Sequence, residues 1–184
     1  MQTARASVMH RVENCISCNL FGTGSCWAFA STETLESTWA LKTGILQELS
    51  EQFVLDCTPN PHSCGGTGGC GGGTAALVYN QLQKYGGIPS EWTYPYISGS
   101  AGAAGKCHGL PLKPLTPHSG EPMQSANVTG HVSLKTNSYK AMLDAVSKVG
   151  PLTITVDAGA RGEGRWGEWD DRMFEAVGQG SGVR

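Results

Sequence analysis

Apolar side chains recur every three to four positions in several stretches of the chain, and this spacing predicts helices. In the first stretch, Phe29, Leu35 and Trp39 form an inward stripe, and Gly44 marks the helix end. The second begins at Ser50, a residue type that caps helix N-termini well. The helices predicted in this way cover residues 25–43, 49–57, 74–85 and 138–149.

Shorter apolar runs predict strands. Residues 152–156 alternate large aliphatic side chains with threonines, and residues 128–134 are a second candidate strand. Residues 86–137 hold six of the nine prolines, which predicts mostly irregular structure there. Towards the C-terminus glycine, arginine and tryptophan become frequent while aliphatic residues become rare. We therefore expect residues 159–184 to be a divergent, disordered tail.

Composition argues against several classes of protein. Charged residues make up 15% of the chain and the formal net charge is −2, which argues against nucleic-acid binding. No run of about 18 apolar residues occurs, so we expect no membrane span. The first residues, MQTARASVMHRVENC, lack the apolar core of a secretory signal peptide, and none is expected in this chain. Seven cysteines are more than a typical cytosolic protein carries, which indicates an oxidising compartment.

Cys26 lies at the predicted start of the first helix, behind the small residues Gly22, Gly24 and Ser25. A thiol becomes a good nucleophile when its thiolate is favoured. The unpaired N–H groups and the dipole of a helix N-terminus favour an anion at such a position. The Cys26 backbone N–H is also placed to help hold an oxyanion. A buried structural cysteine is the alternative that helix position alone leaves open.

The segment from Gly24 to Phe29, GSCWAF, resembles the nucleophile motif of papain-like cysteine proteases, the cathepsin type. Further motifs of that family follow in the family's order: LSEQ at 49–52, DC at 56–57, GCGGG at 69–73, YPY at 94–96, Cys107, and GPLTI with VDA between 150 and 158. The resemblance covers roughly residues 24–158. The ordered series argues against an unrelated glycine-rich domain.

The resemblance implies an α+β fold of two lobes, with the active site in the cleft between them. One lobe is mainly helical and carries the nucleophile helix, and the other is a β-barrel-like lobe. In this chain the helical lobe is expected to be present and the β lobe only in part. The expected division is a divergent N-terminal segment, the helical lobe, the partial β lobe and the tail, at residues 1–23, 24–120, 121–158 and 159–184.

The activity implied by the resemblance is that of a cysteine-type endopeptidase. The Cys26 thiolate would attack a peptide carbonyl, and water would hydrolyse the acyl-enzyme. Gly72 and Gly73 would line the substrate cleft, and Thr155 would lie near the pocket for the second residue before the cut. The implied partners are peptide or protein substrates and protein inhibitors, bound by a monomer, with no metal or other cofactor. Family members are lysosomal, vacuolar or secreted.

The resemblance also implies a disulfide between Cys57 and Cys107. Cys70 would normally pair with a cysteine three residues before the nucleophile, where this chain has Thr23. The alternatives for Cys70 are a bond to Cys64, Cys18 or Cys15, or a reduced thiol. Cys15-x-x-Cys18 has the spacing of half a structural zinc site, but Cys64 and Cys70 make a poor second half, so no metal site is expected.

Three departures from the family pattern concern catalysis. The family's oxyanion-hole glutamine falls at Leu20, and the adjacent Asn19 is a weak substitute with a shorter arm. The family's histidine lies about 130–150 residues after the nucleophile, but no histidine follows His131. The asparagine that orients this imidazole in the family also has no counterpart, because no asparagine follows Asn137. We expect His131 to be structural or at the surface. Little or no peptidase turnover is therefore expected of this chain alone, and a non-catalytic homologue that binds peptides or inhibitors is the alternative.

Overall fold

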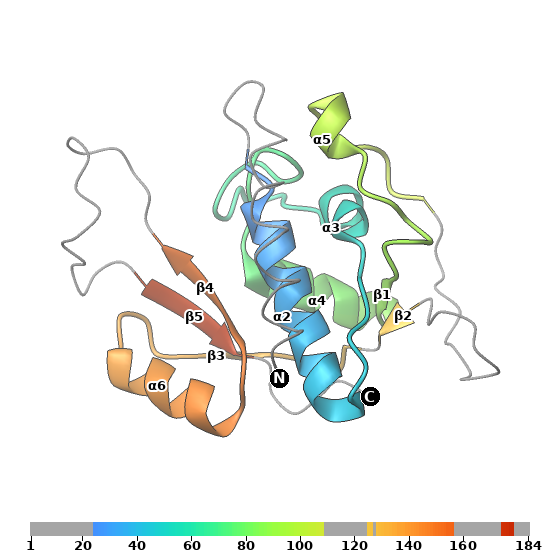
Figure 1. Ribbon diagram of the computed structural model, residues 1–184. Coiled ribbons are helices and arrows are strands. Elements are labelled where there is room, and N and C mark those ends of the chain that lie inside the picture. The colour runs from blue at the N-terminus through green and yellow to red at the C-terminus, as the bar shows by residue number, and fades with distance from the viewer. Residues whose placement is uncertain (1–23, 109–124, 127, 157–173, 179–184) are drawn as a thin grey trace.

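A computed structural model of the chain describes residues 24–108, 125, 126, 128–156 and 174–178 (Figure 1). The helices are α2 (Cys26–Thr43), α3 (Glu51–Cys57), α4 (Ala75–Tyr85), α5 (Ser98–Ala101) and α6 (Tyr139–Lys148). The strands are β1 (Ile88–Pro89), β2 (Ser125–Ala126), β3 (Val132–Ser133), β4 (Leu152–Val156) and β5 (Phe174–Gly178).

Helix α2 crosses the middle of the helical part and packs against α3 and α4 (Figure 1). The side chains predicted to face inward, Phe29, Leu35 and Trp39, are buried, which confirms the apolar stripe. Polar residues are buried along the same helix. The hydroxyls of Ser31 and Thr32 donate to the carbonyls four residues earlier, both at 2.6 Å, so that burial leaves these donors satisfied.

The main hydrophobic core lies between the helices of the first half of the chain. Burying a side chain as large as leucine or phenylalanine contributes about 1.5–3 kcal/mol relative to leaving it exposed. Members of this core from α2, α3, α4 and β1 include Leu35, Phe53, Val54, Val78, Tyr79, Leu82 and Ile88. This packing fixes the position of α2, and therefore of its N-terminal end.

The helix ends are fixed by local signals. Gly44 and Gly86 follow α2 and α4 in the left-handed conformation, with φ of 77° and 79°, which glycine adopts at little cost. At the N-termini of α3 and α6, the hydroxyls of Ser50 and Ser138 accept bonds from backbone N–H groups three residues later, at 2.9 and 3.3 Å. These four positions confirm the predicted helices to within two residues.

Two antiparallel sheets complete the described structure. β1 pairs with β2, and β5 lies between β3 and β4. The predicted strand at 152–156 is confirmed, whereas only Val132–Ser133 of the candidate strand at 128–134 is a strand. The expectation of a disordered tail is wrong for residues 174–178, because β5 pairs through its backbone with a strand on each side. The rest of the tail lies outside the described residues.

The cysteines follow the predicted pattern in part. Cys57 and Cys107 form a disulfide with a Cα–Cα distance of 4.8 Å, as the resemblance implies. Cys64 has a free, exposed thiol, so the alternative Cys64–Cys70 bond is not formed. The Asn60 side chain bonds both backbone groups of Cys64 at 2.9 Å and holds it at the surface, while Cys70 is buried in the core. Cys15 and Cys18 lie outside the described residues.

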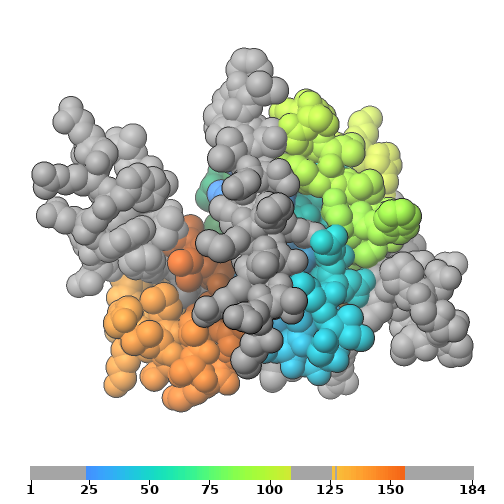
Figure 2. Space-filling model, viewed as in Figure 1, coloured from blue at the N-terminus to red at the C-terminus, as the bar shows by residue number. Residues whose placement is uncertain are grey.

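The arrangement of elements confirms the expected α+β class. Helices α2 to α4 form one part of the molecule, and the sheet β3–β5–β4 lies beside α2 with α6 below it (Figure 1). In the space-filling view the residues of the α6–β4 region lie on one side, and the C-terminal end of α2 with the residues that follow it lies on the other (Figure 2). The helical lobe is thus present, together with a small sheet.

Candidate active site

Cys26 is the first residue of α2 and is exposed to solvent. The preceding residue, Ser25, is fully buried and its side chain makes no capping bond to the helix. No acidic residue lies in the first turn of α2. The positive end of an 18-residue helix therefore faces a solvent-accessible sulfur without a competing carboxylate. This arrangement argues against the alternative of a buried structural cysteine.

Tyr96 holds the start of this helix in place. Its hydroxyl lies 3.3 Å from the Ser25 hydroxyl, and its ring packs edge-on against Phe29 with centroids 5.0 Å apart. Tyr96 belongs to a YPY motif whose role could not be assigned from the sequence. The motif itself was the available signal, and the structure shows that its second tyrosine positions the turn that carries Cys26.

The glycine-rich loop packs directly against the residue after Cys26. The Trp27 indole is buried and its Nε1 donates to the Gly69 carbonyl at 3.0 Å. A Cβ on Gly73 would lie 2.9 Å from indole carbons, so only glycine fits there. Gly24 and Gly71 form an isolated parallel bridge between the two segments. The loop and the cysteine helix are therefore one packed unit.

Gly72 and Gly73 differ in what their backbones contact. The Gly72 N–H donates to the Gly69 carbonyl at 3.4 Å, and its carbonyl accepts from Gly68 at 2.8 Å. Gly72 also has a φ of 93°, which the loop requires. Within the described residues, neither the N–H nor the carbonyl of Gly73 takes part in a hydrogen bond. Gly72 shapes the loop through its backbone bonds, whereas the backbone of Gly73 has no such bond in the described part of the chain.

Strand β4 runs antiparallel to α2, and two close approaches show which residues of α2 lie beside it. A Cβ on Gly150 would lie 3.2 Å from the Leu41 side chain, and Thr153 Oγ1 lies 2.8 Å from Thr34 Oγ1. Thr155 is on the same face of the strand as Thr153, about 6.6 Å further along. Thr155 is exposed and lies towards the Cys26 end of α2. The strand thus brings the predicted pocket residue to the same end of the molecule as the thiol.

The structure describes His131 but not the two residues considered for the oxyanion hole. Asn19 and Leu20 lie outside the described residues. The His131 ring packs against Tyr79 with centroids 5.7 Å apart, and burial lowers the pKa of this imidazole. The prediction of a structural role for His131 agrees with this packing. Two further histidines in the described part, His62 and His108, are exposed in loops.

Two other properties concern the described residues as a whole. No helix among them has both the length and the apolar character needed to cross a bilayer. No three histidine, cysteine or acidic side chains in that part of the chain gather as a metal site would require. Cys15 and Cys18, half of the zinc spacing considered above, are not in this part.

Comparison with known proteins identifies the family. The family model described as papain family cysteine protease matches residues 3–164. Human cathepsin L2 is 36% identical over 136 residues, which cover 74% of this chain and 35% of cathepsin L2. Stem bromelain of Ananas comosus is 37% identical over 139 residues, which cover 74% of this chain and 54% of bromelain. The chain therefore spans about a third to about half of these relatives' length.

Solved structures agree with the sequence relatives. The bromelain protease of Ananas comosus, solved with the inhibitor E64, has 35% identity and a TM-score of 0.55, over 76% of this chain and 55% of that one. A Carica candamarcensis cysteine protease, solved with E-64, has 27% identity and a TM-score of 0.56, over 76% and 56%. The shared fold, the motif around Cys26 and the extent of the family match lead to one conclusion: this chain belongs to the papain family of cysteine proteases.

Proposed function

We propose that Cys26 is the nucleophile of a papain-type peptidase site and that it attacks the carbonyl carbon of a bound peptide. The observation that carries this proposal is an exposed thiol at the N-terminus of α2, beside a loop that requires glycine at positions 72 and 73. The Cys26 N–H at this helix end is one donor for the oxyanion that develops on the carbonyl.

The peptide would lie extended between the glycine loop and β4. The free N–H and carbonyl of Gly73 support main-chain pairing with a substrate, since they have no partner within the described residues. Gly72 contributes by holding the loop in shape. Thr155 would form part of the opposite wall, where its short side chain leaves a shallow pocket. The substrates of this proposal are peptides or proteins, and protein inhibitors would occupy the same groove.

We propose that turnover by this polypeptide alone is low. Breaking the C–N bond of an amide requires a proton for the leaving amine, and a positioned imidazole typically accelerates such transfers by about 10²–10⁴. No histidine follows His131, and His131 packs against Tyr79. An oxyanion donor missing at the Leu20 position would raise the barrier by about a further 2.7–4 kcal/mol. Acylation of Cys26 would then be slow.

The compartment and the assembly are part of the same proposal. The Cys57–Cys107 disulfide is stable only where thiols are not kept reduced, which supports a lysosomal, vacuolar or secreted location. The cathepsins among the relatives support the same assignment. We propose that the chain acts as a monomer, with residues 24–120 and 121–158 as the helical and partial β lobes.

A dipeptidyl epoxide tests the proposed nucleophile, because it alkylates a thiolate without an amine leaving group. We expect one probe per chain, attached at Cys26 and abolished by Cys26→Ser, while Cys64→Ser leaves labelling unchanged. A fluorogenic peptide amide should show little or no release under the same conditions. Labelling confined to Cys64, or none at all, would contradict the assignment of Cys26. Rapid amide turnover would contradict the low activity.

The second candidate is a non-catalytic homologue that binds peptides in the same groove. The observation that favours it is that the three described histidines lie in exposed loops or against Tyr79. In that case a peptide aldehyde or amide would bind equally well to wild type and Cys26→Ala. If Cys26 reacts with bound carbonyls, the aldehyde should instead lose affinity in Cys26→Ala while the amide does not.

A further inference from the structure

Three buried hydroxyls join three different elements below the candidate site. Tyr79 on α4, Thr153 on β4 and Thr34 on α2 are all at most 5% exposed. The Tyr79 hydroxyl lies 2.5 Å from Thr153 Oγ1, which in turn lies 2.8 Å from Thr34 Oγ1. Thr34 Oγ1 donates to the Ala30 carbonyl at 2.8 Å. The sequence does not reveal this cluster, because threonine and tyrosine occur there at positions that suit apolar residues.

The direction of the hydrogen bonds follows from counting donors. Each hydroxyl has one proton to donate. Thr34 donates to the Ala30 carbonyl, so it accepts the proton of Thr153, whose hydroxyl also lies 3.4 Å from the Ala30 carbonyl. Thr153 accepts the proton of Tyr79, whose hydroxyl also lies 3.4 Å from the Ser31 carbonyl. The result is a one-way chain from α4 through β4 to α2, in which all three donors are used. The carbonyl at its end belongs to Ala30, one helical turn after Cys26.

α2 and β4 do not close on each other completely at this level. An open pocket of about 220 Å³ lies between the two elements. Its walls are Ala30, Glu33, Thr34 and Ser37 of α2 with the segment Pro151–Ile154. Thr153, the one buried residue of Leu152–Thr155, is held to α2 by directional bonds on the neighbouring side.

We propose that Thr153 is a positioning residue, which sets the register of β4 against α2 and thereby the distance of the Thr155 wall from the Cys26 thiol. This inference rests on the proposed function in one respect, namely that peptides bind in the groove between the glycine loop and β4. Thr153 does not touch the substrate. Its hydroxyl acts through the strand, and Thr155 lies two residues further on the same face.

Two reagents separate positioning from reactivity. Iodoacetamide needs only an accessible thiol, whereas a dipeptidyl epoxide also needs the opposite wall of the groove. Both rates are measured in a Cys64→Ser background, because Cys64 is also free and exposed. We expect Thr153→Val to slow the epoxide reaction at Cys26 about three- to tenfold, as for the loss of one buried hydrogen bond, and to leave the iodoacetamide rate within about twofold. Thr153→Ser, which keeps the hydroxyl, should restore the epoxide rate. Thr38→Val, which removes an α2 hydroxyl outside the chain of bonds, is the matched control and should change neither rate.

Equal epoxide rates in wild type and Thr153→Val would overturn the positioning role while leaving Cys26 as the nucleophile. If wild type reacts with iodoacetamide but not with the epoxide, the proposed function fails. Amide hydrogen exchange then tests separately whether Thr153 holds β4 against α2. The amides of Leu152–Val156 should exchange faster in Thr153→Val, and in Tyr79→Phe to a smaller extent, than in wild type or Thr153→Ser. Unchanged exchange in both variants would overturn the inference independently of any reaction.

Discussion

The glycine loop approaches the cysteine helix closely because Gly73 has no Cβ. The Trp27 indole fills the space where Gly73 would carry a Cβ, and its N–H is used by the Gly69 carbonyl. A larger residue at Gly73 would have to displace a buried tryptophan. The need for glycine therefore arises from close packing beside the thiol and not from loop flexibility.

His131 gives the stability a dependence on pH. Burial beside Tyr79 lowers the pKa of His131 from its ordinary value of 6.5, so the unfolded chain binds this proton more readily than the folded one. This contribution is therefore constant above about pH 6.5, and stability is lost as the pH falls below that value. We expect His131→Phe, which keeps a ring against Tyr79, to reduce the loss. Urea unfolding at about pH 7.5 and about pH 5 measures this loss of stability in wild type and variant.

The quantity to compare is the change in the free energy of unfolding between the two pH values. Its value at a single pH is not informative, because His131→Phe also changes burial at every pH. A smaller difference in the variant than in wild type supports the assignment. An identical difference would mean that other groups account for the whole pH dependence and that the folded protein accepts the His131 proton as readily as the unfolded chain does.

At the level of elements, sequence predicted what local chemistry determines. Ser50 marks the start of α3 through its side-chain hydroxyl, and Gly86 marks the end of α4 through its left-handed backbone, so the predicted and observed ends agree. β5 was missed because Phe174–Gly178 is defined by pairing with β3 and β4, which are distant in the chain. The same holds for Thr153, whose partners Thr34 and Tyr79 become visible only when α2, α4 and β4 meet.

For the candidate site, the motif around Cys26 was sufficient to predict a thiol at a helix start. It was not sufficient to separate Gly72 from Gly73, since both are glycines in one motif and only the loop geometry shows whose backbone is engaged. The Cys57–Cys107 pairing was available only through the resemblance. Alternatives for Cys70 stayed open because spacing does not show that Asn60 holds Cys64 at the surface.

The disulfide ties α3 to the segment at Cys107 across a sequence separation of 50 residues. Closing a loop of this length restricts the unfolded chain, and removing such a bond typically costs about 2–5 kcal/mol. We expect Cys107→Ser to lower the free energy of unfolding by that amount, measured by urea denaturation without reductant. Cys64→Ser is the matched control, because it removes an exposed thiol without a bond, and should change stability by less than about 0.5 kcal/mol. Equal stability of the two variants would show that the loop is held by other contacts.

Across the whole molecule, burial is unevenly distributed. The core contains side chains of α2, α3 and α4 with neighbours from β1 and β2, but none from α6. Tyr139, Leu143, Val146 and Val149 in and after α6 are 70%, 49%, 50% and 55% exposed. Helices gain most of their stability in proteins from packing an apolar face. The region of α6 is therefore expected to open more easily than the helical part.

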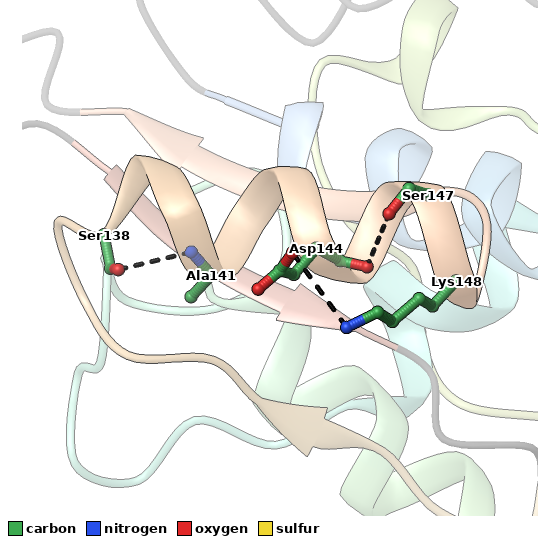
Figure 3. A network of polar contacts seen from close by, with 5 residues as sticks. All are labelled: Ser138, Ala141, Asp144, Ser147 and Lys148. Carbon is green, nitrogen blue, oxygen red and sulfur yellow. Dashed lines mark hydrogen bonds and ion pairs between the residues drawn. The ribbon is translucent and has the colours of Figure 1, made fainter.

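The local interactions of α6 are too weak to replace the stabilisation that a buried apolar face would give. Figure 3 shows what holds it: the Ser138 cap, a bond from the Ser147 hydroxyl to the Asp144 carbonyl, and the Lys148–Asp144 pair at 4.0 Å. Both charged side chains are more than half exposed, and such pairs contribute about 0.3–0.5 kcal/mol. A ten-residue helix with no fully buried side chain is marginal in water.

Hydrogen exchange measured by mass spectrometry on the full chain tests this difference. Amides of α6 should exchange at least about 100-fold faster than those of α2, because local opening of α6 exposes little new surface whereas opening of α2 disrupts the core. Ser138→Ala should accelerate α6 further and leave α2 unchanged, since it removes only the local cap. Equal protection of both helices would mean that the apolar face of α6 is covered in solution.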